Sequence, residues 1–430
     1  MGGHRHRRHW LIGAGGCLAL TIAFLIWFAC EDPPGPSHRL PDGTVMSLRA
    51  ATYGTDPHVH CDGPNWVRVL HRMAPAVGAA GSFGCCALDA PADSPQLWFR
   101  ISPTMAEAAS ETEWLVEDQH GCTFGPPLYG SEFIAPSFRQ DKQIRFRLFA
   151  PEVYPRRERS FRFVLRHASG NNPAAAFTIA NPTPGRHPRW QALPYPVRAT
   201  RGRWTFALTQ MRAEPSTPEW SSPCVAEFAY SRDGVAGGRW FPASVRVTDA
   251  TGNQFEVPAD GTAAHRITFP ALCRRESAWK LNVRFAHRDP ETAAPVATFT
   301  ARNLAAPGPR SSVSYMVNAT VAGAVVRTVR LTRTPASANG NDECMVGLLV
   351  GRADSDALQW TLLDVSAERG RAIALPGRAW PNRTTVAEGR DADRLKLGRF
   401  RLPAGVQKVN LTFAVHAVET AEFVAKPPAP

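Results

Sequence analysis

One sequence pattern occurs three times along this 430-residue chain, and it restricts the possible folds more than any other feature. Each copy joins two short segments that mix apolar and polar residues. The clearest copy reads LNVRFAH and then, after a polar loop, TFTARN. The copies are residues 161–167 with 176–181, 281–287 with 298–303, and 409–415 with 422–427. Such a repeat predicts similar domains in tandem.

The repeated segments have the periodicity of β-strands. Residues 143–148 place Ile144, Phe146 and Leu148 on one side and arginines on the other, and residues 408–415 alternate in the same way. A period of two indicates half-buried strands with one face toward a core. Helical periodicity is almost absent. The chain is therefore predicted to be all-β.

Turn residues recur at matching places in the copies. Asp118 and Asp249 each begin an Asp-x-x-Gly-x-x-Phe sequence, and Asp364 with Gly370 is the third counterpart, with a longer turn. Aspartate caps such turns and glycine supplies a positive φ angle, so we interpret these aspartates as turn caps rather than catalytic acids. Short strands end before or at prolines, which cannot donate to a ladder: Pro151, Pro270 and Pro403.

Six or seven such strands in each stretch of about 110 to 150 residues predict antiparallel sandwiches of two sheets, three in tandem. The predicted organisation is a basic tail (1–9), a transmembrane helix (10–30), a proline-rich linker (31–37), and sandwiches at 38–185, 186–307 and 308–430. The first sandwich carries an insertion, with a short amphipathic helix expected near 64–76. His167 and His287 end equivalent strands, and we assign both a packing role.

The N-terminal segment is expected to anchor the protein in a membrane. Residues 10–29 carry no charge and are about long enough to cross a bilayer as a helix. Arginines precede the segment and should stay cytoplasmic, which places residues 31 onward outside the cytoplasm. A cleaved signal peptide and a lipoprotein lipidated at Cys30 are the alternatives. Trp27, where a small residue belongs, favours the uncleaved anchor over both.

The net charge of +12 could attract phospholipid headgroups or anionic envelope polymers. The basic residues are nearly all arginine and form no cluster, and alanine and proline are raised with them, as in GC-rich genomes. Composition therefore explains the charge without a binding patch. We expect the membrane as a partner through residues 10–30, an envelope protein or glycan as a second partner, and no nucleic acid.

Seven cysteines follow the anchor, at irregular spacings that do not indicate a disulfide scaffold. Cys224 and Cys273 are the first candidate pair, because both fall within the second repeat. The one cluster of metal-capable side chains precedes Cys85 and Cys86 and comprises His58, His60, Cys61 and His71. Its spacing matches no established zinc site, so a loop beside a disulfide is favoured over a metal centre. We expect no cofactor.

The usual catalytic signatures are absent: the nucleophile elbow, the zinc-protease helix, the phosphate loop and the dinucleotide fingerprint. The tandem pattern resembles immunoglobulin-like and fibronectin-type sandwiches. The stretches LPDGT at 40–44 and ATYGT at 51–55 are similar to uncharacterised membrane-anchored bacterial proteins. That resemblance implies no activity.

Two functional hypotheses follow. The first is a non-catalytic, membrane-anchored envelope protein that binds or acts as a spacer through its sandwiches, since repeated domains without a catalytic signature usually hold or bind. The alternative is a hydrolase of an envelope polymer with its site in the first-domain insertion, at His58, His60 and His71.

Overall fold

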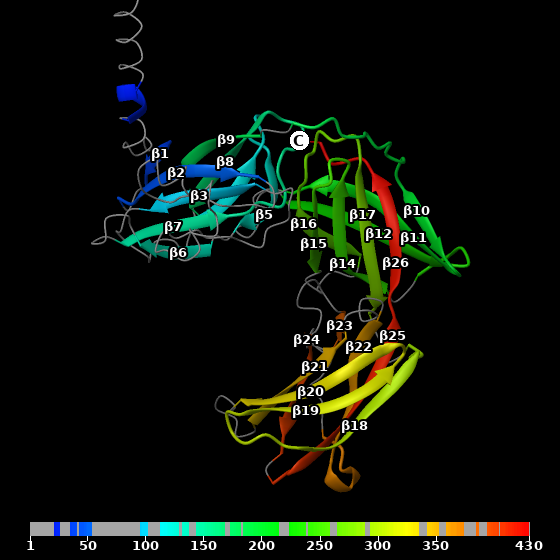
Figure 1. Ribbon diagram of the computed structural model, residues 1–430. Coiled ribbons are helices and arrows are strands. Elements are labelled where there is room, and N and C mark those ends of the chain that lie inside the picture. The colour runs from blue at the N-terminus through cyan, green and yellow to red at the C-terminus, as the bar shows by residue number, and fades with distance from the viewer. Residues whose placement is uncertain are drawn as a thin grey trace, which may run out of the picture. The chain divides into compact units, whose positions relative to one another are not determined.

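The computed structural model shows an all-β protein (Figure 1). It describes residues 21–25, 35–40, 43–53, 95–101, 112–128, 131–136, 143–167, 173–181, 184–214, 223–237, 240–258, 265–288, 293–334, 342–351, 358–373, 384–386, 394–403 and 405–429. The chain divides into two compact units. Unit 1 comprises Met1–Arg186 and Ser216–Ser222, and unit 2 comprises His187–Pro215 and Pro223–Pro430.

Unit 1 is built from two antiparallel sheets, with strand orders β1-β2-β3-β7-β6 and β5-β4-β8-β9. The strands are β1 Ser37–Arg39, β2 Val45–Thr52, β3 Gln96–Ile101, β4 Thr112–Glu117, β5 Thr123–Leu128, β6 Ser131–Pro136, β7 Gln143–Phe149, β8 Ser160–His167 and β9 Pro173–Ala180. The Phe99 ring on β3 lies 5.4 Å from that of Phe163 on β8 and 5.8 Å from that of Trp114 on β4. Aromatic packing thus joins the sheets as the first sheet pair.

Unit 2 contains the second sheet pair. One sheet holds β10 Val197–Arg201, β11 Trp204–Ala213, β12 Pro223–Arg232, β13 Val235–Ala236 and β16 Arg266–Pro270; the other holds β15 Gln254–Pro258, β14 Trp240–Asp249, β17 Trp279–His287 and β26 Glu419–Ala425. Phe206 on β11 stacks on Phe285 of β17 with ring centroids 4.4 Å apart. Phe423 of β26 lies 5.7 Å from Phe228 of β12. These rings form the core between the two sheets.

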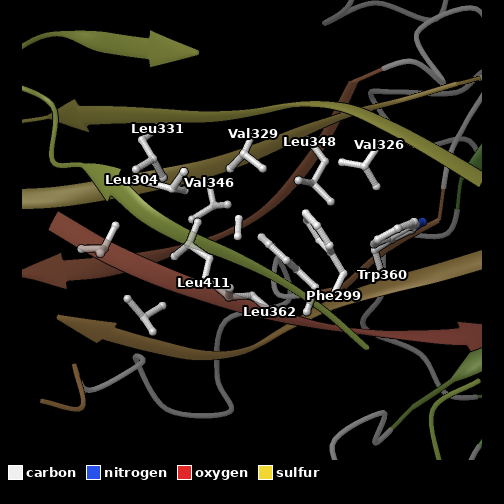
Figure 2. Close-up of a cluster of buried hydrophobic side chains, with 14 of the residues drawn as sticks. Phe299, Leu304, Val326, Val329, Leu331, Val346, Leu348, Trp360, Leu362 and Leu411 are labelled. Atoms are coloured by element: carbon white, nitrogen blue, oxygen red, sulfur yellow. The ribbon is translucent and has the colours of Figure 1, made fainter. Parts of the chain in front are cut away.

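The third sheet pair, also in unit 2, has an aliphatic core. Its sheets are β19 Ser312–Val321, β20 Ala324–Thr334, β21 Asp342–Val350 and β24 Arg394–Leu402, and β18 Ala297–Ala305, β25 Lys408–Ala417, β22 Leu358–Ala367 and β23 Thr384–Val386. Figure 2 shows Val329 and Leu331 of β20 facing the opposite sheet, which contributes Leu362 and Leu411. Trp360 is fully buried in the same core.

The second and third sheet pairs exchange their last strands. β18 follows β17 in the sequence but pairs with β25, where Thr300 lies opposite Thr412. β26 follows β25 but pairs with β17, where Glu422 lies opposite Asn282 (Figure 1). The predicted boundary at residue 307 assigned β18 to the second sandwich and β26 to the third, so the observed pairing is the reverse. In unit 1 the corresponding strands β8 and β9 pair directly with each other.

The connections explain this difference. Only Val418 separates β25 from β26, and residues 414–421 contain no glycine, proline, asparagine or aspartate. A hairpin needs at least two loop residues, of types that favour a tight turn. The chain therefore continues nearly straight from the third sheet pair into the second. Val418 is buried at this crossing, packed with Ala243 and Ala286.

The predicted strand pattern is confirmed. Residues 143–148 lie in β7, and the apolar side chains of β25 predicted to face the core are at most 1% exposed: Val409, Leu411, Phe413 and Val415. β7 and β24 end before Pro151 and Pro403, and β16 ends at Pro270. The three copies of the opening pattern fall on β8 with β9, β17 with β18, and β25 with β26.

Most of the expected N-terminal anchor lies outside the described residues. Within residues 10–30 the structure describes only 21–25, which are helical. Among the residues that the structure describes, no helix is long and apolar enough to span a membrane. The expected insertion helix near 64–76 also lies outside the described residues.

Candidate functional site

The metal-capable residues singled out in the first-domain insertion lie outside the described residues: His58, His60, Cys61 and His71. Within the described part of the chain, no group of three or more histidine, cysteine, aspartate or glutamate side chains is placed to hold a metal ion. A site must therefore be sought among the polar groups that the sheets themselves bring together.

Asp118 and Asp249 are turn caps, as the repeat predicted. Oδ1 of Asp118 accepts hydrogen bonds from the backbone amides of His120 and Cys122, each at 2.8 Å. Oδ1 of Asp249 accepts from the amides of Thr251 at 2.8 Å and Asn253 at 3.2 Å. Both aspartates are almost completely buried. Oδ1 of each aspartate is thus bonded within its own turn, which gives both acids a structural role.

The third aspartate does not match the other two. Asp364 is exposed in the middle of β22 rather than at a turn. The turn that corresponds to the Asp249 turn begins at Ala367, whose amide bonds the carbonyl of Arg371, and it contains the 3-10 helix η2 Glu368–Gly370. The expected equivalence of Asp364 was therefore wrong, because β22 continues three residues farther before it turns.

The candidate disulfide between Cys224 and Cys273 is not formed in the structure, since Cys224 carries a free thiol. Cys224 is fully buried on β12, where Nη2 of Arg274 lies 4.0 Å from its sulfur. Burial raises the pKa of this thiol to about 11, against the opposing effect of Arg274. Cys344, its counterpart on β21, is also buried, and burial raises its pKa to about 12. Buried neutral thiols of this kind are unreactive core groups.

Three tyrosines fasten the exchanged or terminal edge strands. The Tyr53 hydroxyl donates to the carbonyl of Ala180 at the end of β9, at 2.6 Å. The Tyr195 hydroxyl donates to the carbonyl of Lys426 just after β26, at 2.8 Å. The Tyr315 hydroxyl bonds the carbonyl of Ala305 at the end of β18. Burial raises the pKa of all three phenols, that of Tyr195 to about 12.

The most unusual polar arrangement lies where the second and third sheet pairs meet. Gln359, which is 0% exposed on β22, makes two hydrogen bonds to the backbone of His287 at the end of β17. Its Oε1 accepts from the His287 amide and its Nε2 donates to the His287 carbonyl, each at 2.8 Å. The side-chain amide thereby takes the place of a neighbouring strand.

The ring of His287 is held between two other rings. It stacks on the indole of Trp240, with centroids 4.1 Å apart and planes at 29°. The ring of His416, on β25, lies edge-on to it at 5.7 Å. His416 is also the cross-strand neighbour of Gln359. We name Trp240, His287, Gln359 and His416 the junction cluster.

Both imidazoles of the junction cluster favour the neutral form. Burial lowers the pKa of His287, and the proximity of His416 lowers it further. Burial also lowers the pKa of His416, against a smaller opposing effect of the backbone of Ala294. Neither ring nitrogen of His416, which is 1% exposed, makes a hydrogen bond of normal geometry. A buried imidazole without a strong partner is uncommon in proteins.

The junction cluster combines two imidazoles with an indole and a side-chain amide, and its two imidazoles make it a proton-sensitive contact. Sequence reasoning named His287 only as a packing residue and did not identify Gln359, His416 or Trp240. One signal was available. His416 lies in the turn-free segment 414–421, which is the place where the chain crosses between sheet pairs.

No protein-family model matches the chain, and no curated protein matches it.

Proposed function

We propose that this chain is a non-catalytic, membrane-anchored protein of the cell envelope, whose tandem β-sandwiches hold a position outside the membrane or bind an envelope protein or glycan. The single-pass anchor is residues 10–30, with the N-terminus cytoplasmic. The proposal rests on the sequence of that segment and on the construction of unit 2.

The strand exchange is the observation that favours a spacer or binding role most. β25 and β26 form one nearly continuous run that belongs to both sheet pairs of unit 2. A force along this run is borne by the backbone hydrogen bonds of two sheets at once. Tandem domains joined by a flexible linker would instead move independently. Interlocked pairs suit a protein that must keep its distal end at a defined distance.

The repeated polar residues also favour this role over catalysis. The conspicuous acids Asp118 and Asp249 are used as turn caps, and the buried thiols Cys224 and Cys344 are core groups. The hydrolase alternative relies on His58, His60 and His71, which lie outside the described residues.

A membrane and topology test comes first. The full chain with a C-terminal epitope tag should sediment with membranes after alkaline washing, and protease should remove the tag in cells whose outer layers have been opened. Protection of a cytoplasmic control protein shows that the inner membrane is intact. If the tag is also protected under these conditions, the C-terminus is cytoplasmic and the proposal is contradicted.

A polymer assay then separates binding from hydrolysis. The full chain should co-sediment with purified insoluble envelope glycan and release no soluble fragments from it. A variant with alanine at His58, His60 and His71 should behave identically. Release of fragments by the natural chain, lost in that variant, would support the hydrolase instead.

A further inference from the structure

The junction cluster joins the second and third sheet pairs through contacts of different kinds. The Gln359 amide bonds the backbone at the end of β17, and the His287 ring stacks between Trp240 and His416. Beside them the β25–β26 run crosses at Val418, which packs with Ala243 and Ala286. Of these contacts, the ring packing depends on the charge of the two imidazoles, whereas the covalent crossing does not.

The charged groups on the elements that meet here offer these imidazoles no carboxylate partner among the described residues. They are Arg246 and Asp249 on β14, Lys280, Arg284 and Arg288 on or beside β17, Asp364 on β22, Lys408 on β25, and Glu419 and Glu422 on β26. Asp249 caps its own turn, and Glu422 pairs with Lys280. Residues 293–296 carry no charge, and Asp289 and Glu291 lie outside the described residues.

Two of these groups flank the junction along the chain. Glu419 lies opposite Phe285 in the β17–β26 ladder, and Arg288 is an exposed residue that follows His287. The one titratable group with an electrostatic effect on His287 in the described part of the chain is His416. Two cations at this separation would repel each other, with little solvent to screen them.

We propose that the junction cluster is a pH-responsive connection, closed while His287 and His416 are neutral and loosened when they are protonated. The tether through Val418 keeps the two sheet pairs together in both states. Loosening consists of loss of the ring stack and of the Gln359 bonds to the His287 backbone. This inference does not depend on the proposed envelope function, and it would hold for a protein in any compartment that acidifies.

The direction of the pH effect follows from the cost of burying charge. An unfolded or exposed histidine has a pKa near 6.5, and the pKa of both imidazoles is lower than this in the closed junction. The open state therefore binds more protons as pH falls below about 6.5. Above that pH the closed junction has its full stability relative to the open state. This stability decreases as pH falls from about 6.5 toward the pKa values of His287 and His416 in the closed junction. The indole face of Trp240 can offset part of the cost of a buried positive charge on His287, because the two rings are stacked, but it cannot do so for His416.

Hydrogen exchange of the full chain in detergent tests the proposal. Peptides that cover β17 and residues 408–419 are compared at pH 7.5 and pH 5.5, after correction for intrinsic exchange, with β12 as the internal reference. We expect protection at the junction to fall between pH 7.5 and pH 5.5 by up to about tenfold for each imidazole, because pH 5.5 lies about one unit below the pKa of an exposed histidine, while β12 is unaffected. In His416→Leu, which places an uncharged side chain of similar volume in the buried site, this acid-dependent loss should be much smaller. His265→Gln, at an exposed histidine of the second sheet pair, should respond like the natural chain.

Equal protection at both pH values in the natural chain would overturn the proposal, as would an unchanged acid response in His416→Leu. If His416→Leu does not fold, the imidazole resonances of the natural chain decide the question by NMR. Two junction histidines that titrate below 6.5 together with the loss of protection support the connection. Junction histidines that titrate at or above 6.5 contradict it.

Discussion

The side chain of Gln359 is bonded at both ends to the backbone of His287, with Nε2 and Oε1 each 2.8 Å from their partners. These residues belong to different sheet pairs, β22 to the third and β17 to the second. Glutamine is well suited to this place, because its amide offers both an acceptor and a donor for the N–H and C=O of one residue. A buried strand end is thereby satisfied by a residue 72 positions away.

Replacement of Gln359 by leucine should destabilise unit 2 by about 1 to 3 kcal/mol, because it leaves a donor and an acceptor of the partly buried His287 backbone unsatisfied. Urea unfolding of the full chain, followed by hydrogen exchange of β17 and β22, measures the loss. Asp364→Ala on the same strand is the matched control. It removes an exposed side chain and should change stability by less than about 0.5 kcal/mol. Equal effects of the two substitutions would contradict this role of Gln359.

Phe423→Ala in β26 should weaken the second sheet pair, although residue 423 belongs to the last repeat of the sequence. Its ring is fully buried against Phe228 and Phe285, so truncation should cost about 3 to 5 kcal/mol. Exchange protection should be lost mainly in β12 and β17. Loss confined to β21 and β22 would indicate that β26 folds with the third sheet pair instead.

Asp249→Ala should destabilise the chain by about 2 kcal/mol or more, since the carboxylate accepts from two backbone amides and from the side chains of Thr251 and Asn253. Asp364→Ala again serves as the control, because the repeat aligns the two aspartates but only one of them caps a turn. Thermal unfolding of both variants measures the difference. The sequence alignment alone would predict equal losses.

Tyr195→Phe should cost about 1 kcal/mol and act on the second sheet pair, because it removes the hydrogen bond to the Lys426 carbonyl that fastens the end of β26. The corresponding Tyr315→Phe should act on the third sheet pair, where Tyr315 bonds the end of β18. Urea unfolding with site-resolved exchange distinguishes them. If both variants lose exchange protection in the same strands, the two tyrosines do not act on separate sheet pairs and the assignment is wrong.

The strands could be predicted because alternation of apolar residues directly reflects burial on one face, as in 408–415. The Asp118 and Asp249 turns could be predicted because their geometry is local. The exchange of β18 and β26 could not be predicted from the repeat, since both strands would satisfy either edge equally well. The sequence feature that indicates the exchange is the absence of turn-forming residues between 414 and 421. Gln359 and His416 belong to no local sequence motif, and only their long-range neighbours give them a role.

The most direct test of the interlocked architecture is the partner of β17. Asn282 lies opposite Glu422 of β26 in the exchanged arrangement, and Cα atoms of such antiparallel neighbours are within reach of a disulfide. In a local hairpin like β8–β9, where Arg162 lies opposite Thr178, the repeat would place Asn282 opposite Thr300. Cysteines at 282 and 422 should therefore cross-link on mild oxidation of the folded full chain, and cysteines at 282 and 300 should not. Cross-linking of the second pair and not the first would contradict the strand exchange.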